Sequence, residues 1–285
     1  MGEDLISPMF MFVFKILAGA YMTHFNTKQP NYCSSKEKYL TRELHIGHIY
    51  PLFTGDSVMT NRQYYFLSNI QDKSEGSEVS QLIKPRSNGQ FVPLQNIYGV
   101  DIDGKIIKKN KKNWGQANWI PDEWTKAITK ESCKENFNPG IIYLDTTYFV
   151  DSKKTTEEKV EYKYPALRAL EVTLKVCQNL EKVLVIANFM MANPRSGKGE
   201  DQFGPNSIIE NLILSDHPNT YADWNVSPLD KGINIFHSYE YRTRKTPMRS
   251  YIFFKGTLPE EDTIVEVFSS FSDWCVYNSD QLILS

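Results

Sequence analysis

The sequence predicts an α/β protein built on a mostly parallel β-sheet. Two short apolar runs, residues 140–147 and 183–187, are rich in β-branched side chains and bounded by turn residues. Such runs are typical of strands that are buried on both faces of a parallel sheet. Apolar residues between the two runs recur at helical spacing and make one helix face: Leu167, Leu170, Leu174 and Cys177. A strand, a helix and a strand in this order form a crossover unit, which requires a parallel pair of strands.

Periodicity and turn residues divide the rest of residues 61–256 into alternating strands and helices. The predicted strands are 63–68, 96–101, 116–120, 140–146 and 182–190. The predicted helices are 79–83 after a cap at Ser77, 121–133, the crossover helix, and 207–214. Two further strands, 232–241 and 248–254, are joined by only six residues and therefore form an antiparallel hairpin. We expect a sheet that is parallel over most of its width, ends in this hairpin and carries helices on both faces.

We expect three regions along the chain of 285 residues. Residues 1–60 form an N-terminal extension that is partly helical, residues 61–256 form the sheet domain, and residues 257–285 form a C-terminal helix and tail. Apolar residues make up 41% of the chain, which is enough for a proper core. The net charge of −2 gives no global attraction to nucleic acids or acidic membranes.

Cysteine usage and the N-terminal region favour a cytoplasmic protein. No two of the four cysteines have the spacing of a zinc site or a redox motif, so we expect no bound metal. The stretch Met9–Met22 is apolar, but acidic residues precede it and Lys15 interrupts it, unlike a signal peptide. It is shorter than the ~20 apolar residues that span a bilayer, so we expect a buried helix or an extension and no stable membrane association. Met1 and Met22 are both candidate starts of translation.

Residues 44–51 contain the tetrapeptide His45-Ile-Gly-His48. Pro51 and Gly55 discourage a long helix here, so we expect a strand with two exposed histidines. The tetrapeptide resembles the first signature of the class I aminoacyl-tRNA synthetases, in which the histidines contact nucleotide phosphates. That resemblance implies an alternative function, adenylyl or nucleotidyl transfer through His45 and His48. The lysine-rich second signature of that family is absent.

Polar residues follow two predicted strands at the end where a parallel sheet binds ligands. Asp101 and Asp103 follow strand 96–101, and the loop after strand 63–68 contains Asn69, Asp72 and Gly76. A carboxylate at a strand end accepts hydrogen bonds from the paired hydroxyl groups of a ribose. The sequence therefore predicts an adenosine-containing ligand between this loop and residues 101–103.

The order of these elements resembles the fold of the class I S-adenosylmethionine-dependent methyltransferases, a Rossmann-like sheet, over roughly residues 60–256. The resemblance rests on the order of elements and on the strands that end in acids, and it includes no clear glycine-rich motif. It implies S-adenosylmethionine as the cofactor. By position, the implied cofactor-binding residues are Asn69, Asp72, Gly76, Asp101, Asp103 and Asn118. The first three border the methionine part, one of the two aspartates holds the ribose, and Asn118 lies near the adenine.

The resemblance also implies a reaction site at the end of strand 140–146. Asp145-Thr-Thr-Tyr148 occupies the place where amino-group methyltransferases carry Asp/Asn-Pro-Pro-Tyr, although both prolines are missing. Asp145 would accept a proton or a hydrogen bond from the nucleophile, and Tyr148 would stack on a planar substrate. The structural alternatives are a turn-capping role for Asp145 and core packing for Tyr148. The implied substrate-binding residues are Thr146, Thr147, Asn193 and Arg195.

Two basic runs, Lys105–Lys112 and Arg242–Arg249, are candidate contacts to nucleic acid. The first precedes two tryptophans, and the second lies between aromatic strands. Most runs of this kind are only solvated faces. The alternative is a patch that binds phosphates and uses the aromatic side chains as platforms. A non-catalytic, methyltransferase-like module that contacts nucleic acid or a protein partner is therefore the main alternative to a methyltransferase of unknown substrate.

Overall fold

The computed structural model describes part of the chain in detail. The described residues are 36–51, 61–85, 92–149, 153–155, 161–163, 165–190, 228–229, 232–233, 237–243, 246–256 and 282–283. All of them belong to the unit Cys33–Ser285. The predictions for Met9–Met22, for a helix at 207–214 and for Asn193 and Arg195 lie outside the described residues.

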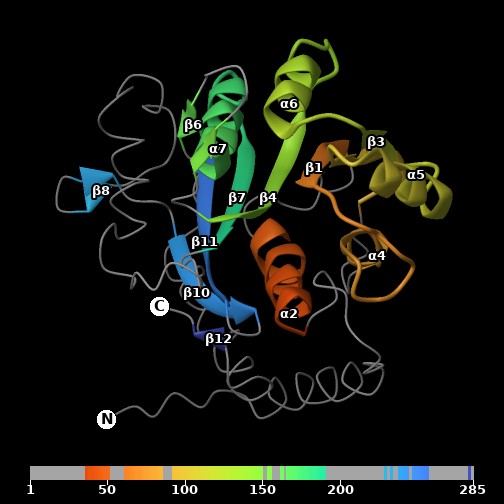
Figure 1. Cartoon of the computed structure of the whole chain (residues 1–285), viewed down its shortest axis with the longest axis horizontal. Coiled ribbons are helices and arrows are strands. Elements are labelled where there is room, and N and C mark those ends of the chain that lie inside the picture. Colours follow the sequence, from red (N-terminus) through yellow and green to blue (C-terminus); the bar gives the residue numbers. More distant parts are fainter. Residues whose placement is uncertain are drawn as a thin grey trace, which may run out of the picture. The chain divides into compact units, whose positions relative to one another are not determined.

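Within these residues the main sheet has the strand order β12-β10-β11-β7-β4-β1-β2-β3 (Figure 1). Its strands are β1 Gln63–Leu67, β2 Ile97–Val100, β3 Asn118–Ile120, β4 Pro139–Phe149, β7 Val183–Met190, β10 His237–Thr243, β11 Thr246–Lys255 and β12 Leu282–Ile283. Two short antiparallel pairs are separate from it: β5 Lys153–Thr155 with β6 Glu161–Lys163, and β8 Pro228–Leu229 with β9 Gly232–Ile233.

The five strands from β3 to β7 are parallel, and the sheet then changes direction. Parallel pairing joins β3 to β2, β2 to β1, β1 to β4 and β4 to β7. Strand β11 runs antiparallel to both β7 and β10, so β10 and β11 form the predicted hairpin. The predicted strand 232–241 is wrong at its start, because β10 begins at His237 and Gly232–Ile233 pairs with β8 instead. The fold class predicted from the sequence, a mostly parallel α/β sheet that ends in an antiparallel hairpin, is therefore confirmed.

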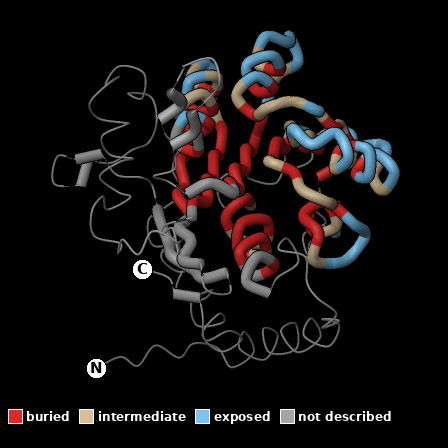
Figure 2. Tube along the Cα trace, viewed as in Figure 1, coloured by how far each residue is buried: buried red, intermediate tan, exposed pale blue. Residues whose placement is uncertain are grey.

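Helices cover both faces of the sheet, as predicted. The helices are α2 Lys36–Leu44, the π-helix η3 His45–Ile49, α4 Glu78–Ile83, the short 3-10 helix η4 Leu94–Asn96, α5 Gly104–Asn113, α6 Trp124–Ser132 and α7 Pro165–Val176. One core cluster joins α2, α4 and α5 to the sheet through Leu44, Leu82 and Ile107. A second cluster joins α6 and α7 to the opposite face through Ile128 and Leu170. Figure 2 shows the buried sheet and the exposed outer sides of α5, α6 and α7, whereas the part of α2 that it colours is mostly buried.

The strand predicted at residues 44–51 is wrong, because the structure is helical there. Helix α2 continues into η3, and its core-facing residues Ile46, Ile49 and Tyr50 are buried. These residues are spaced three and four apart, which is the period of a helix rather than a strand. Pro51 acts only at the end of the segment, where it does not interrupt the helical turns. His45 is buried, so the expected pair of exposed histidines does not exist.

Within the described residues, no helix combines the length and the apolar character that crossing a bilayer requires.

A close approach between β2 and β3 requires glycine at position 99. A Cβ atom on Gly99 would lie 2.3 Å from Cζ3 and 2.5 Å from Cε3 of Trp119, and 3.2 Å from Cβ of Ser68. The indole of Trp119 is buried, and it donates from Nε1 to the carbonyl oxygen of Trp114 over 2.9 Å. The ring therefore has little freedom to move away.

We predict that Gly99→Ala destabilises the protein by about 1–3 kcal/mol, because the methyl group overpacks the contact with Trp119. The free energy of unfolding is measured by urea denaturation. Gly104→Ala is the matched control, because a Cβ atom on Gly104 meets nothing within 4 Å. Equal stability of the two variants would contradict this account of the packing.

Candidate functional site

Three neighbouring strands bring polar residues to one edge of the sheet. The strand order reverses between β1 and β4, and ligands of open parallel sheets bind beyond the carboxyl ends of the strands at such a point. Leu67 pairs with Val100, and Phe66 pairs with Tyr143. Continuing these registers along each strand puts Ser68, Asp101 and Asp145 at one level. The edge of the sheet where the sequence predicts ligand binding therefore contains Asp101 and Asp145 together. This edge, with Ser68, Asp101 and Asp145, is called the candidate edge below.

Asp101 and Asp103 have different roles in the turn after β2. Asp103 caps α5, since its Oδ1 accepts from the backbone N–H of Lys105 over 2.8 Å. Asp101 is half-buried, and its Oδ1 accepts from the backbone N–H of Asp103 over 2.8 Å. Burial raises the pKa of Asp101, and the hydrogen bond from Asp103 offsets part of this shift. Asp101 is thus the partly desolvated carboxylate at the end of β2, whereas the carboxylate of Asp103 serves the helix.

Ile102 lies between the two aspartates, and sequence reasoning missed it. Its side chain is 74% exposed, and no other large apolar side chain in the described part of the chain is classed as exposed. The sequence could have indicated a role for Ile102, because an isoleucine between two aspartates at a strand end is unusual in a solvated turn. The turn therefore presents an apolar surface beside a carboxylate.

The predicted cofactor loop after β1 is held by side chains of α5. The side chain of Asn110 is fully buried: its Oδ1 accepts from the N–H of Gln71 over 2.8 Å, and its Nδ2 donates to the carbonyl of Asn69 over 2.8 Å. Asn113 donates from Nδ2 to the carbonyl of Gln71 over 2.9 Å. The indole N–H of Trp114 donates to the carbonyl of Asp72 over 3.3 Å. Two of the predicted residues, Asn69 and Asp72, therefore lie on a loop that α5 fixes through its backbone.

The start of α4 is also occupied by groups of the chain itself. Ser77 is the predicted cap, and its Oγ accepts from the N–H of Ser80 over 3.2 Å. The N–H of Val79 donates to Oε1 of Gln71 over 3.3 Å. The carbonyl of Gly76 accepts from Nη1 of Arg42 over 2.7 Å, which ties the loop to α2. Gly76 thus contributes a carbonyl anchor, and its predicted contact with the methionine part of a cofactor stays a prediction.

Ser68 contributes a buried hydroxyl group to the candidate edge. Its backbone N–H donates to the carbonyl of Val100 over 2.8 Å, which continues the ladder between β1 and β2. Its Oγ is buried and makes no hydrogen bond within the described residues. A buried hydroxyl group normally has a partner, so this atom is available to a polar group of a ligand.

Asp145 lies in β4 next to a buried polar cluster. Asp145 is 9% exposed and is level with Asn188 of β7. Thr146 donates from Oγ1 to the carbonyl of Asn188 over 2.9 Å, and Nδ2 of Asn188 donates to the hydroxyl of Tyr143 over 2.6 Å. The hydroxyl of Ser250 donates to Oδ1 of Asn188. Sequence reasoning missed Asn188 and Ser250, although an asparagine that closes the apolar run 183–187 is a visible signal.

Two residues of the predicted reaction motif are placed only by their backbone. Thr147 and Tyr148 belong to β4, but their side chains lie outside the described residues, as do Asn193 and Arg195. Their predicted roles stay predictions.

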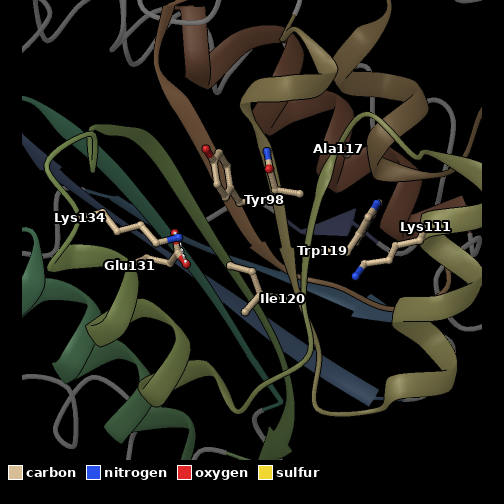
Figure 3. A pocket seen from close by; sticks show the side chains of 8 residues that line it. Tyr98, Lys111, Ala117, Trp119, Ile120, Glu131 and Lys134 are labelled. Carbon is tan, nitrogen blue, oxygen red and sulfur yellow. Dashed lines mark hydrogen bonds and ion pairs between the residues drawn. The ribbon is translucent and has the colours of Figure 1, made fainter.

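Asn118 lies at the amino end of β3, away from the carboxyl edge that holds Asp101. Its Nδ2 donates to the carbonyls of Gln95, over 2.8 Å, and of Ile97, over 3.3 Å, and so holds the turn before β2. It lines a pocket of about 330 Å³ at the edge of the sheet, where Lys111 lies on one side and the ion pair of Glu131 with Lys134 on the other (Figure 3). The structure thus gives Asn118 a backbone-supporting role, and its contact with an adenine stays a prediction.

His45 belongs to the core rather than to a surface site. Its ring packs edge-on against Tyr143 with centroids 5.2 Å apart, and it lies 6.4 Å from the ring of Tyr50. Polar groups near this ring form hydrogen bonds with one another: the hydroxyls of Tyr50 and Tyr64 are 2.9 Å apart, and Tyr64 donates to Glu78. The ring of His45 is therefore part of the packed core and is not exposed for contact with nucleotide phosphates.

The sheet and its hairpin make the class I methyltransferase-like, Rossmann-like fold that the sequence resembled. No protein-family model and no curated protein matches the sequence. The chain is similar to a TehB-like SAM-dependent methyltransferase from Corynebacterium glutamicum, with a TM-score of 0.38 and 11% identity, covering 87% of this chain and 96% of that one. It is also similar to TrmK of M. capricolum in complex with S-adenosylhomocysteine, with a TM-score of 0.35 and 10% identity, covering 82% of each chain.

We predict that Asn110→Ala destabilises the protein by roughly 2–4 kcal/mol, because it leaves the buried N–H of Gln71 and the carbonyl of Asn69 without partners. Asn113→Ala removes one hydrogen bond from a half-buried residue and should cost only about 0.5–1.5 kcal/mol. Chemical denaturation of both variants tests the difference. If the two substitutions cost the same, Asn110 does not hold the loop as described.

Proposed function

We propose that this protein is an S-adenosylmethionine-dependent methyltransferase that binds the adenosine part of its cofactor at the end of β2. The observation that carries the proposal is the juxtaposition of a partly desolvated carboxylate, Asp101, with an exposed isoleucine, Ile102. Both features are unfavourable in a turn with a purely structural role, because burial disfavours the charge and water disfavours the apolar surface. Such pairs are typical of ligand sites.

The chemistry of adenosine matches these two residues. The ribose offers paired hydroxyl donors, which an ionised carboxylate accepts well. The adenine ring is planar and largely apolar on its faces, so packing it on Ile102 would remove both surfaces from water. Ser68, at the neighbouring strand end, supplies a buried hydroxyl group that has no partner among the described residues. These three residues fit the cofactor that the fold implies.

The methionine part of the cofactor has a different environment from a glycine-rich loop. The N–H of Gln71 in the loop already donates to Asn110, and the N–H of Val79 at the start of α4 already donates to the side chain of Gln71. Recognition of the amino acid end would therefore depend on side chains such as Asn69 and Asp72, which the sequence indicated, rather than on backbone amides. The exposed Asp72 suits an ammonium group, since its carboxylate otherwise meets only Ser74 in the described part of the chain.

Methyl transfer requires little chemistry from the protein. S-adenosylmethionine, when bound, supplies a methyl group on a sulfonium that is already activated. The protein's part is to align a nucleophile and exclude water. Asp145, which is nearly buried in β4 at the level where β1 ends, would accept a proton or a hydrogen bond from that nucleophile. Thr146 and Asn188 would hold this part of β4 in place through their hydrogen bond.

A non-catalytic module with the same fold is the second candidate. The absence of prolines in Asp145-Thr-Thr-Tyr148 and the loop amides occupied by the chain itself favour it. It predicts that the cofactor either fails to bind or binds without any transfer to an acceptor.

We predict that Asp101→Asn weakens binding of S-adenosylmethionine by more than about tenfold, because an amide accepts ribose hydroxyls less well than a carboxylate. Isothermal titration calorimetry of the full chain measures the affinity, with ATP as the comparison ligand. Asp103→Asn is the matched control and should bind like the wild type, because asparagine caps a helix as well as aspartate does.

Calorimetry of Ile102→Ala tests the apolar half of the proposed site. This variant should also lower the affinity while leaving the fold intact, because the side chain is exposed in the free protein. Unchanged binding by Asp101→Asn, or absence of binding by the wild type, would contradict the proposal.

The raised pKa of Asp101 predicts an effect of pH on stability. The folded protein holds this proton to a higher pH than the unfolded chain does, so the ionised carboxylate destabilises the fold near neutral pH. This destabilisation is relieved as the pH falls through the raised pKa. Asp101→Asn should therefore raise the melting temperature at about pH 7, and the gain should shrink as the pH approaches about 4. Thermal melts of both proteins test this, and a variant less stable at neutral pH would contradict it.

A further inference from the structure

One face of α5 carries an unbalanced row of positive charge. Lys105, Lys108, Lys109 and Lys112 fall at helical spacing on a single stripe, opposite the buried residue Ile107. All four are exposed, and so is Lys111 beside them. Figure 2 shows the exposed outer side of this helix, which is labelled in Figure 1. No ion pair in the described part of the chain involves any of the five lysines.

This arrangement is unfavourable for the helix itself. Lys105 and Lys109, and likewise Lys108 and Lys112, are like charges four residues apart, which destabilises a helix. Lys105 also lies in the first turn, where the helix dipole disfavours a cation. Only Lys111 and Lys112, in the last turn, gain from the dipole. The helix would be more stable with neutral residues at 105, 108 and 109, so its own folding does not account for these lysines.

A further lysine, Lys73, lies beside the residue that follows α5. The ammonium group of Lys73 lies over the ring of Trp114, 5.9 Å from its centroid. Lys73 is exposed, and Trp114 follows directly after the helix. The first turn of α5 follows Asp103, so the other end of the row begins at the candidate cofactor edge. The row of four lysines on α5 therefore starts near that edge and spans about 10 Å of the helix.

We infer that this stripe, defined by Lys105, Lys108, Lys109, Lys112 and Lys73, binds the phosphate backbone of a nucleic acid. A polyanion with regularly spaced charges matches a row of lysines that extends over about two helical turns. An acidic membrane fits less well, because a membrane-binding helix also presents apolar side chains on its outer face, and Ile107 is buried. The inference rests on the proposed function where it names nucleic acid as the class of methyl acceptor. The binding itself is independent of that function.

The test compares two variants of the full chain that each lose three positive charges. One is Lys105→Gln, Lys108→Gln, Lys109→Gln on the stripe. The matched control is Lys126→Gln, Lys130→Gln, Lys175→Gln, three exposed lysines on α6 and α7, which cover the opposite face of the sheet. The probe is a fluorescently labelled single-stranded RNA of about 20 nucleotides, titrated without cofactor between about 50 and about 200 mM salt.

We expect wild-type affinity to fall steeply with salt, because each phosphate contact releases a counterion. The stripe variant should bind roughly tenfold or more weakly at low salt, and its salt slope should be smaller by about 2, since three contacts are lost. The control variant should keep the wild-type slope. Thermal melts should show the stripe variant at least as stable as the wild type, because glutamine keeps the helix propensity and removes the repulsion.

Equal loss of RNA affinity in the two variants, a flat salt response, or binding to vesicles of anionic lipid in place of RNA would overturn the inference. The proposed function fails separately, when calorimetry without RNA shows no binding of S-adenosylmethionine. If the protein binds RNA as expected but does not bind S-adenosylmethionine, only the proposed function is contradicted. If it binds S-adenosylmethionine but does not bind RNA as expected, only the inference about the stripe is contradicted.

Discussion

The structure depends on the pairing of β1 with parallel strands on both sides. Every backbone group of a central strand must be satisfied by its neighbours, because no water reaches it. Parallel pairing on both sides then fixes the direction of each strand, so that the carboxyl ends of β1, β2 and β4 all lie at one edge. This constraint brings Ser68, Asp101 and Asp145 to one level although they are far apart in the sequence. The chemistry of the candidate site is a consequence of that convergence.

Side-chain amides replace glycines in shaping the candidate site. In Rossmann-like folds a glycine-rich loop lets the backbone approach the ligand closely. Here Asn110 and Asn113 reach from α5 to the loop after β1, and Arg42 reaches from α2 to Gly76. The loop is therefore shaped by neighbouring helices, and its specificity must come from side chains at the strand ends.

The sequence predicted the sheet well, because strands buried on both faces carry continuous apolar runs. A crossover unit was predicted correctly from the apolar run 183–187 and from the apolar helix face that contains Leu170 and Leu174. The predictions were wrong where one local sequence feature is compatible with two different structures. Pro51 indicated a break in residues 44–51, but the helical structure includes Pro51. Asn110 lies within a basic run that is typical of a solvated face, yet it is buried because the loop after β1 folds onto it. Contacts of this kind join distant segments and leave no periodic pattern.

The anchored loop has a thermodynamic consequence for any ligand that binds at this edge. Ordering a flexible loop on binding costs conformational entropy, which is subtracted from the affinity. The hydrogen bonds between Asn110 and the backbone of Asn69 and Gln71 already order the loop in the folded protein, before a ligand binds. A ligand that binds as proposed would therefore meet a pre-organised edge, and covering Ile102 would contribute to its hydrophobic gain. The binding heat capacity would then report the small apolar area covered rather than the folding of a loop.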